Sequence, residues 1–132
     1  MLEDEEERLV RFAAVLSEQK HKIEFLHWRT VDEFIAGFTN TTKTPNLICL
    51  DHDLFTDSPD DPDPGDGRDV AEFLARKTPC CPIVIHSSNQ PAADSMYFTL
   101  ADAKWDVEKI APLGEDWIES YWWTTAKPLI AE

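Results

Sequence analysis

The chain has 132 residues, 42% of them hydrophobic, and this content is enough for the core of one ordinary domain. Its formal net charge of -14 opposes binding to nucleic-acid duplexes and to anionic membranes, because both contacts depend on Lys and Arg. Its apolar runs are shorter than the roughly 18 residues of a membrane span, and its acidic start is unlike a signal peptide. We therefore expect a single cytoplasmic domain over residues 1–132.

The three cysteines agree with that location. Cys49 lies inside an apolar run, and Cys80 and Cys81 are adjacent, so the spacing does not form an even disulfide framework. We interpret Cys49 as a core residue and the adjacent pair as incidental, with metal or redox chemistry as the alternative.

Helical and extended patterns alternate along the chain. Leu9, Phe12 and Leu16 recur at helical spacing after an acid-rich turn, and residues 30–33 form a capping box. Pro91 is typical of the first turn of a helix. The predicted helices cover residues 5–19, 30–38, 69–77, 91–103 and 115–123, and the predicted strands cover residues 23–28, 46–51, 82–86 and 105–110.

This alternation predicts a parallel sheet with helices on both faces, since parallel strands need helical crossovers. The expected fold class is α/β, a three-layer, doubly wound domain with a mostly parallel sheet of five strands. The segment from Met1 to Asp4 has only the pattern of a strand's tail, so we expect the first strand to be short or truncated.

Polar residues follow two of the predicted strands directly. Asp51, His52 and Asp53 stand at the end of the predicted strand 46–51. His86, Ser87, Ser88 and Asn89 stand at the end of the predicted strand 82–86. Open α/β sheets hold their ligands at the carboxyl ends of their strands, so this grouping suits a divalent metal and an anionic, phosphorylated ligand. Each residue also has a structural interpretation: a histidine at a strand end is often a hydrogen-bonded rim residue, and Ser88 and Asn89 suit a helix cap.

Two further segments have competing interpretations. Residues 56–67 are rich in acids, Pro and Gly and are predicted to form a loop. Part of this loop is similar to a calcium loop, but Asp66 stands where the sharp turn requires Gly, so we favour an acidic lid. Aromatic residues at helical spacing near the C-terminus favour a core cluster over a base-stacking surface or a dimer face, and a homodimer stays open. They are Trp117, Tyr121, Trp122 and Trp123.

Several motifs together resemble one protein family. They are the acid pair Glu3-Asp4, the sequence L-D-H-D-L at 50–54, G-x-D-V at 67–70, I-H-S-S-N at 85–89 and the segment 116–122. Over nearly its whole length the chain resembles receiver domains, and more closely the receiver-like domains described as processing cyclic phosphates. The resemblance implies a receiver fold.

The resemblance also implies roles for individual residues. A divalent cation, Mg²⁺ or Mn²⁺, would be held by Asp51 with Glu3, Asp4 or Asp53. Phosphate oxygens would be bound by Ser87, or else Ser88, and by Asn89. Signalling receivers carry a Lys directly before the Pro that ends the last strand. Here Ala111 precedes Pro112 and Lys109 lies two residues too early, which opposes the usual phosphorylation switch.

The histidines then favour hydrolysis, because an imidazole that titrates near neutrality can protonate a leaving oxygen or deprotonate water. We expect His52 or His86 to act as the acid or base beside Asp51. The resemblance implies that the substrate is a small anionic phosphate ester that is cyclic and nucleotide-like. One alternative is a receiver-like module that binds a phosphorylated ligand or partner without turnover. Another is a conventional receiver that accepts a phosphoryl group on Asp51.

Overall fold

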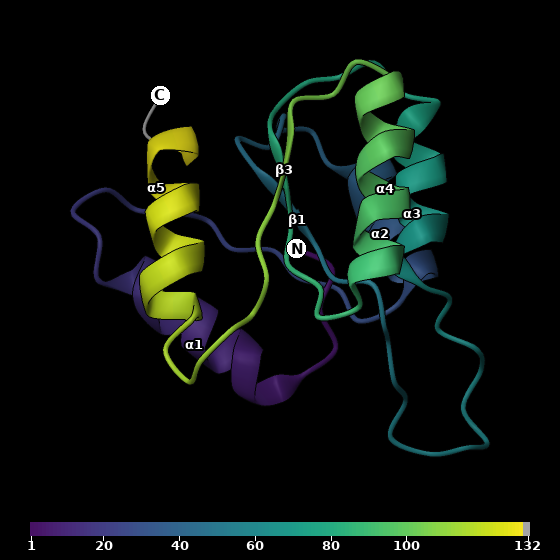
Figure 1. Ribbon diagram of the computed structural model, residues 1–132, viewed down its shortest axis with the longest axis horizontal. Coiled ribbons are helices and arrows are strands. Elements are labelled where there is room, and N and C mark those ends of the chain that lie inside the picture. Colours follow the sequence, from purple (N-terminus) through teal and green to yellow (C-terminus); the bar gives the residue numbers. More distant parts are fainter. Residues whose placement is uncertain (131–132) are drawn as a thin grey trace.

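The computed structural model describes residues 1–130 of the chain. Within them, helices and parallel strands alternate after two initial helices (Figure 1). The elements are α1 (Glu6–Ser17), α2 (Val31–Asn40), β1 (Ile48–Leu50), α3 (Gly67–Ala75), β2 (Ile83–Ile85), α4 (Gln90–Asp102), β3 (Val107–Lys109), a π-helical turn η1 (Ile118–Trp122) and α5 (Trp123–Ile130). The prediction of an α/β fold with a parallel sheet is confirmed.

The sheet has three strands in the order β1-β2-β3, and all neighbours are parallel. Two segments extend it at the β1 edge by single bridges, which join Leu2 to Leu50 and Leu2 to Trp28. The segments therefore lie in the order Trp28, Leu2, β1, β2, β3. Five predicted strands are reduced to three strands and two bridges.

The predicted strand over residues 23–28 is wrong, because only Trp28 forms a bridge there. Its backbone N–H donates to the Met1 carbonyl, and its carbonyl accepts from the Glu3 N–H. Within the described part of the chain, Trp28 pairs in the sheet with Leu2 alone, and a single bridge does not make a ladder. Residues 23–27 consequently remain irregular.

Helices cover both faces of the sheet, as predicted. Alternate residues of a strand point to opposite faces, so Ile48 and Leu50 pack on one face and Cys49 on the other. In Figure 1, α2, α3 and α4 lie together on one side of the strands, and α1 and α5 lie on the other. The first group of helices packs on Ile48 and Leu50, and α1, η1 and α5 pack on Cys49.

Four of the five predicted helices begin and end within two residues of their predicted bounds, and the last one differs more. The start of α3 is two residues earlier, because Asp66 and Asp69 form a reciprocal capping box around its first turn. The last predicted helix, 115–123, is instead the turn η1 followed by α5, which continues through Pro128. Among residues 1–130, no helix is both long and apolar enough to cross a bilayer.

The loop from β1 to α3 is attached to the sheet near both of its ends. The backbone N–H of Phe55 donates to Asp4 Oδ2 at 2.8 Å, and that of Gly67 donates to the His52 carbonyl at 2.9 Å. A Cβ atom at residue 67 would lie 2.2 Å from the Asp51 carbonyl oxygen. Only glycine therefore allows the start of α3 to approach the end of β1 this closely.

Candidate functional site

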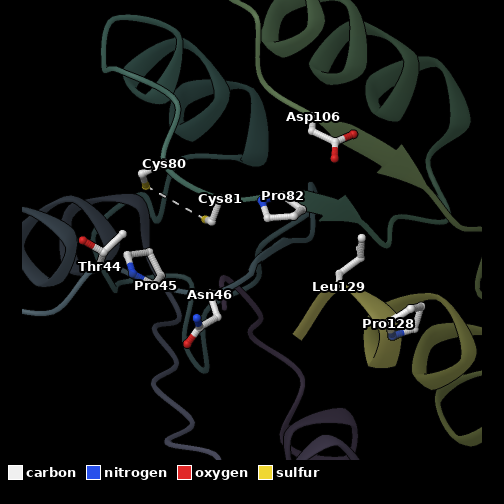
Figure 2. A pocket seen from close by; sticks show the side chains of 9 residues that line it. All are labelled: Thr44, Pro45, Asn46, Cys80, Cys81, Pro82, Asp106, Pro128 and Leu129. Atoms are coloured by element: carbon white, nitrogen blue, oxygen red, sulfur yellow. Dashed lines mark hydrogen bonds between the residues drawn. The ribbon is translucent and has the colours of Figure 1, made fainter. Parts of the chain in front are cut away.

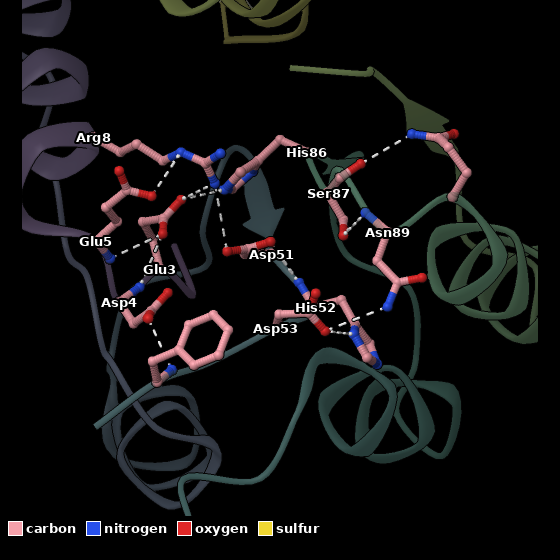
Figure 3. Close-up of polar contacts among 12 residues, drawn as sticks. Glu3, Asp4, Glu5, Arg8, Asp51, His52, Asp53, His86, Ser87 and Asn89 are labelled. Carbon is pink, nitrogen blue, oxygen red and sulfur yellow. Dashed lines mark hydrogen bonds and ion pairs between the residues drawn. The ribbon is translucent and has the colours of Figure 1, made fainter. Parts of the chain in front are cut away.

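Three buried polar side chains lie on the sheet face that α1 covers. Glu3, Asp51 and His86 each follow the last apolar residue of a strand or bridge, and the core residues before them point to the opposite face. Their elements are neighbours in the sheet, so the three side chains meet near its carboxyl edge (Figure 3). The sequence prediction that Asp51 and His86 lie at one rim agrees with this geometry.

Glu3 is the most completely bound of the three. His86 Nε2 donates to Glu3 Oε1 at 3.1 Å, and the backbone N–H groups of Asp4 and Glu5 both donate to Oε2 at 3.0 Å. Burial opposes ionisation, but the hydrogen bond and charge of His86, the Glu5 N–H and the charge of Arg8 outweigh it and lower the pKa of Glu3 to about 2. Glu3 is therefore a buried carboxylate.

Asp51 has the opposite electrostatic balance. Burial, followed by repulsion from Glu3, raises the pKa of Asp51 to about 8, although the His52 N–H donates to its Oδ1 at 2.7 Å. The ionised form of Asp51 is therefore short of stabilising partners. An additional positive charge near its oxygens would favour ionisation.

Arg8, on α1, is a site residue that the sequence analysis missed. Its Nη1 lies 3.5 Å from Glu3 Oε1 and 3.7 Å from Asp51 Oδ2, and its guanidinium lies 5.2 Å from the centre of the Trp117 ring. The sequence signal that could have identified Arg8 is its helical spacing. Arg8 lies one turn before Phe12, which is fully buried against His86. Residue 8 therefore shares the face that α1 presents to the sheet.

Three carboxylates form a group that could hold a metal ion. One oxygen from each of Glu3, Asp4 and Asp51 lies within 4.8 Å of the others. Burial raises the pKa of Asp4, as it does that of Asp51. Hard carboxylate oxygens are the ligands that Mg²⁺ and Mn²⁺ prefer, so the donor set fits the predicted cation. Asp53, also predicted as a ligand, is outside this group.

Asp53 belongs to a second group of hydrogen-bonded side chains, with His52 and Asn89 (Figure 3). His52 Nδ1 donates to Asp53 Oδ1 at 2.6 Å, and Asn89 Nδ2 donates to the same oxygen at 3.4 Å. Asp66 Oδ2 lies 3.7 Å from His52 Nε2. Alternate residues of a strand point to opposite faces, so His52 points away from the face that holds Asp51 and His86. The two predicted histidines therefore lie on different faces of the sheet.

The predicted phosphate-binding residues occupy different environments. Ser87 is buried, and its Oγ accepts from the Asn89 backbone N–H at 3.1 Å. Asn89 caps α4 by accepting from the Ala92 N–H at 3.2 Å. Ser88 is exposed and lines the cavity beside Asp51. Ser88, the second choice from the sequence, therefore lines the cavity, whereas Ser87 does not.

A cavity of about 390 Å³ opens at this edge of the sheet. It is lined by Asp4, Glu5, Arg8, Asp51, Asp53, Phe55, Thr56, Asp57 and Ser88. Five of these residues carry carboxylates and one carries a cation. Neither His52 nor His86 is in the lining, because each imidazole is buried behind a carboxylate.

A family model described as a cyclic-phosphate processing receiver domain matches residues 1–102. The chain belongs to this family. The match includes both halves of the site and ends with α4, so β3, η1 and α5 follow it. No curated protein matches the chain. The resemblance seen in the sequence is confirmed, and receiver domains hold a divalent metal through an acidic cluster of this kind.

This receiver domain departs from signalling receivers at the last strand. Lys109 Nζ is bonded to Asp94 Oδ1 and lies 5.1 Å from the centre of the Tyr97 ring. Its charge is therefore engaged on α4 and not beside Asp51. The cation that approaches Asp51 comes from α1 instead, as Arg8.

A second cavity, of about 370 Å³, lies at the opposite edge of the receiver's sheet (Figure 2). Asn46, Pro82 and Asp106 from its lining precede the three strands. The Sγ atoms of Cys80 and Cys81 are 4.0 Å apart, and burial raises the pKa of Cys81. This cavity lacks the grouped carboxylates of the first, so the first is the candidate functional site.

Proposed function

We propose that this protein hydrolyses a small, nucleotide-like cyclic phosphate ester with the help of a divalent cation. The observation that carries the proposal is the group of Glu3, Asp4 and Asp51 in a cavity at the carboxyl edge of the sheet. The family description supplies the class of substrate.

Asp4 and Asp51 are the residues that we expect to hold the cation, because Glu3 is already bound by His86 and two backbone N–H groups. When bound, a divalent cation supplies Lewis acidity toward a phosphoryl group. It would also offset the negative charge of the cavity, which otherwise repels a phosphate ester.

Hydrolysis of a cyclic phosphodiester forms one P–O bond to water and breaks one ring P–O bond. The proton lost by the water is balanced by the proton gained by the leaving oxygen, and the product is a phosphomonoester. Asp53 is placed to accept the proton from water, because it lines the cavity and is oriented by His52 and Asn89. His52 then acts through Asp53, and His86 acts through Glu3.

The nucleotide-like character of the substrate is supported by Phe55. Its side chain is 76% exposed, it lines the cavity, and its backbone is held by Asp4. Exposed aromatic rings beside a phosphate site are suited to stacking on a base. A base bound there would remain next to the carboxylates that act on its phosphate.

The second candidate function is binding of a phosphorylated ligand without turnover. It is favoured by the burial of both histidines, neither of which lines the cavity. A catalytic site of the kind expected from the sequence would instead expose an imidazole to the substrate.

Incubation with cyclic mononucleotides, cyclic dinucleotides and terminal 2′,3′-cyclic phosphates, each with Mg²⁺ or Mn²⁺, tests the proposal. Phosphorus NMR should show a cyclic ester converted to a monoester, and Asp51→Asn should abolish this conversion. Saturable binding without conversion of any ester would establish the second candidate. Conversion that persists in Asp51→Asn would place the activity outside this cavity.

A further inference from the structure

Arg8 is the one cationic side chain among the described residues that line the candidate cavity. The lining also includes five carboxylates, and the chain as a whole has a net charge of -14. An anionic ligand therefore approaches a strongly negative surface. Of the protein's own groups at this site, Arg8 alone offers positive charge and N–H donors together.

The contacts of Arg8 are close enough for attraction but loose for hydrogen bonding. Its nitrogen atoms lie 3.3 Å from Glu5, 3.5 Å from Glu3 and 3.7 Å from Asp51. Strong charge-assisted N–H···O bonds are about 2.7–2.9 Å long. The guanidinium is thus attracted to several carboxylates without being committed to one of them.

The position of Arg8 is nevertheless fixed. Its guanidinium lies over the Trp117 ring at 5.2 Å, and its side chain is only 19% exposed. A stacked guanidinium keeps its planar edge free for two parallel hydrogen bonds to a phosphate. Other cations nearby are engaged elsewhere: Arg29 is paired with Glu6, and Arg11 is paired with Glu119.

We infer that Arg8 binds the phosphoryl group of the ligand. When a divalent cation is bound by Glu3, Asp4 and Asp51, Arg8 gives up its contacts with the carboxylates and contacts the phosphoryl group instead. This inference rests on the proposed function, because it assigns the anion-binding residue of the same cavity. Without a cation, Arg8 lies beside Glu3 and Asp51 and offsets the negative charge of Glu3. With a cation bound at Asp51, Arg8 would no longer be needed there, and its guanidinium would be available to phosphate.

The exchange predicts opposite effects on two ligands. Arg8→Gln removes a phosphate contact, and it also removes a positive charge that competes with the metal for Asp51. The variant should therefore bind inorganic phosphate more weakly in saturating Mg²⁺, by roughly tenfold to a hundredfold, and bind Mg²⁺ alone at least as tightly as the wild type. A residue with a merely structural role would weaken both.

Calorimetric titrations of Mg²⁺, and of inorganic phosphate in saturating Mg²⁺, test this directly. Arg11→Gln is the matched control, since it makes the same change one turn along α1 and outside the cavity. Arg8→Lys keeps the charge that Glu3 and Asp51 face but loses the planar fork, so it should bind phosphate with intermediate affinity. It also serves as the test if Arg8→Gln does not fold.

Tryptophan emission provides an independent readout, because Trp117 lies against the guanidinium. Phosphate should change the emission of the wild type in Mg²⁺, and it should not change that of Trp117→Phe. Phosphate affinity that is equal in the wild type and Arg8→Gln would overturn the inference, as would absence of phosphate binding by the wild type. Arg8-dependent phosphate binding without turnover of any cyclic ester would support the inference and contradict the hydrolase.

Discussion

His86 and Glu3 are hydrogen-bonded at 3.1 Å, and both side chains are fully buried. The bond joins the end of β2 to the segment that precedes α1. The imidazole also packs between Phe12 and Trp117, with ring centres at 5.3 and 6.0 Å. His86 therefore holds a carboxylate in place and fills the interface between the sheet and α1.

We expect His86→Ala to destabilise the protein by about 3–5 kcal/mol, because it removes a hydrogen-bonded partner from the buried Glu3 carboxylate and empties the space between Phe12 and Trp117. Urea denaturation of the wild type and the variant measures the difference. His21→Ala is the control, since His21 is exposed and should change stability little. If His86→Ala kept full stability while turnover alone fell by about 10²–10⁴-fold, His86 would be an acid or base after all.

Asp51 should make stability depend on pH when chelator is present. Its pKa of about 8 in the folded protein exceeds the ordinary value of 3.8, so the folded state retains a proton that the unfolded state has lost between these values. The free energy of unfolding should therefore fall as pH rises through this window, by up to about 1.4 kcal/mol per pH unit from this group.

Denaturation at pH 5, 6, 7 and 8 in wild type and Asp51→Asn isolates this effect, because the difference between them cancels the other groups. Asn cannot ionise, so the variant should become progressively more stable than the wild type as pH rises. A difference that does not change with pH would show that Asp51 is already ionised at pH 5.

Divalent-cation binding should depend on Asp51 and not on Asp53. Asp51→Asn removes a carboxylate from the group within 4.8 Å, whereas Asp53 is bonded to His52 and Asn89 outside it. Calorimetry should detect no binding of Mg²⁺ or Mn²⁺ to Asp51→Asn and nearly wild-type affinity in Asp53→Asn. Unchanged affinity in Asp51→Asn would remove the metal site.

Treatment with a small phosphodonor and Mg²⁺ should not leave a stable phosphoryl group on Asp51. Lys109 is held by Asp94, and Ala111 has no charge to offer, so a phosphorylated state has little to stabilise it from the last strand. Intact mass measurement checks this outcome. A long-lived adduct on Asp51 with a change in oligomeric state would restore the conventional receiver.

The carboxyl edge of the sheet could be predicted because its residues carry local signals. The run before Asp51 is apolar and ends abruptly in charge, and the run before His86 does the same. The period of two along a strand could also have shown that His52 points away from Asp51. The sequence analysis grouped Asp51 and His52 because both follow the same strand, and so it did not separate the two faces of the sheet.

Other parts of the structure depend on contacts between distant segments. Arg8 enters the site only because α1 packs against the strand ends, and no local motif marks it. The segment before Trp28 has an extended pattern, but Trp28 pairs with Leu2 by a single bridge, which does not make a ladder. Ser88 rather than Ser87 faces the cavity because the backbone turns between β2 and α4.

The attachment of Phe55 to Asp4 and of Gly67 to His52 makes the loop between them part of the binding equilibrium. Any ligand that favours one position of Asp4 also favours one position of the Phe55 backbone. Linkage is reciprocal, so if a ligand restrains residues 56–66, a restraint on these residues changes the affinity of the cavity for that ligand. We therefore expect a ligand that binds in the cavity to change the rate at which a protease cuts this acidic loop, whatever the ligand is.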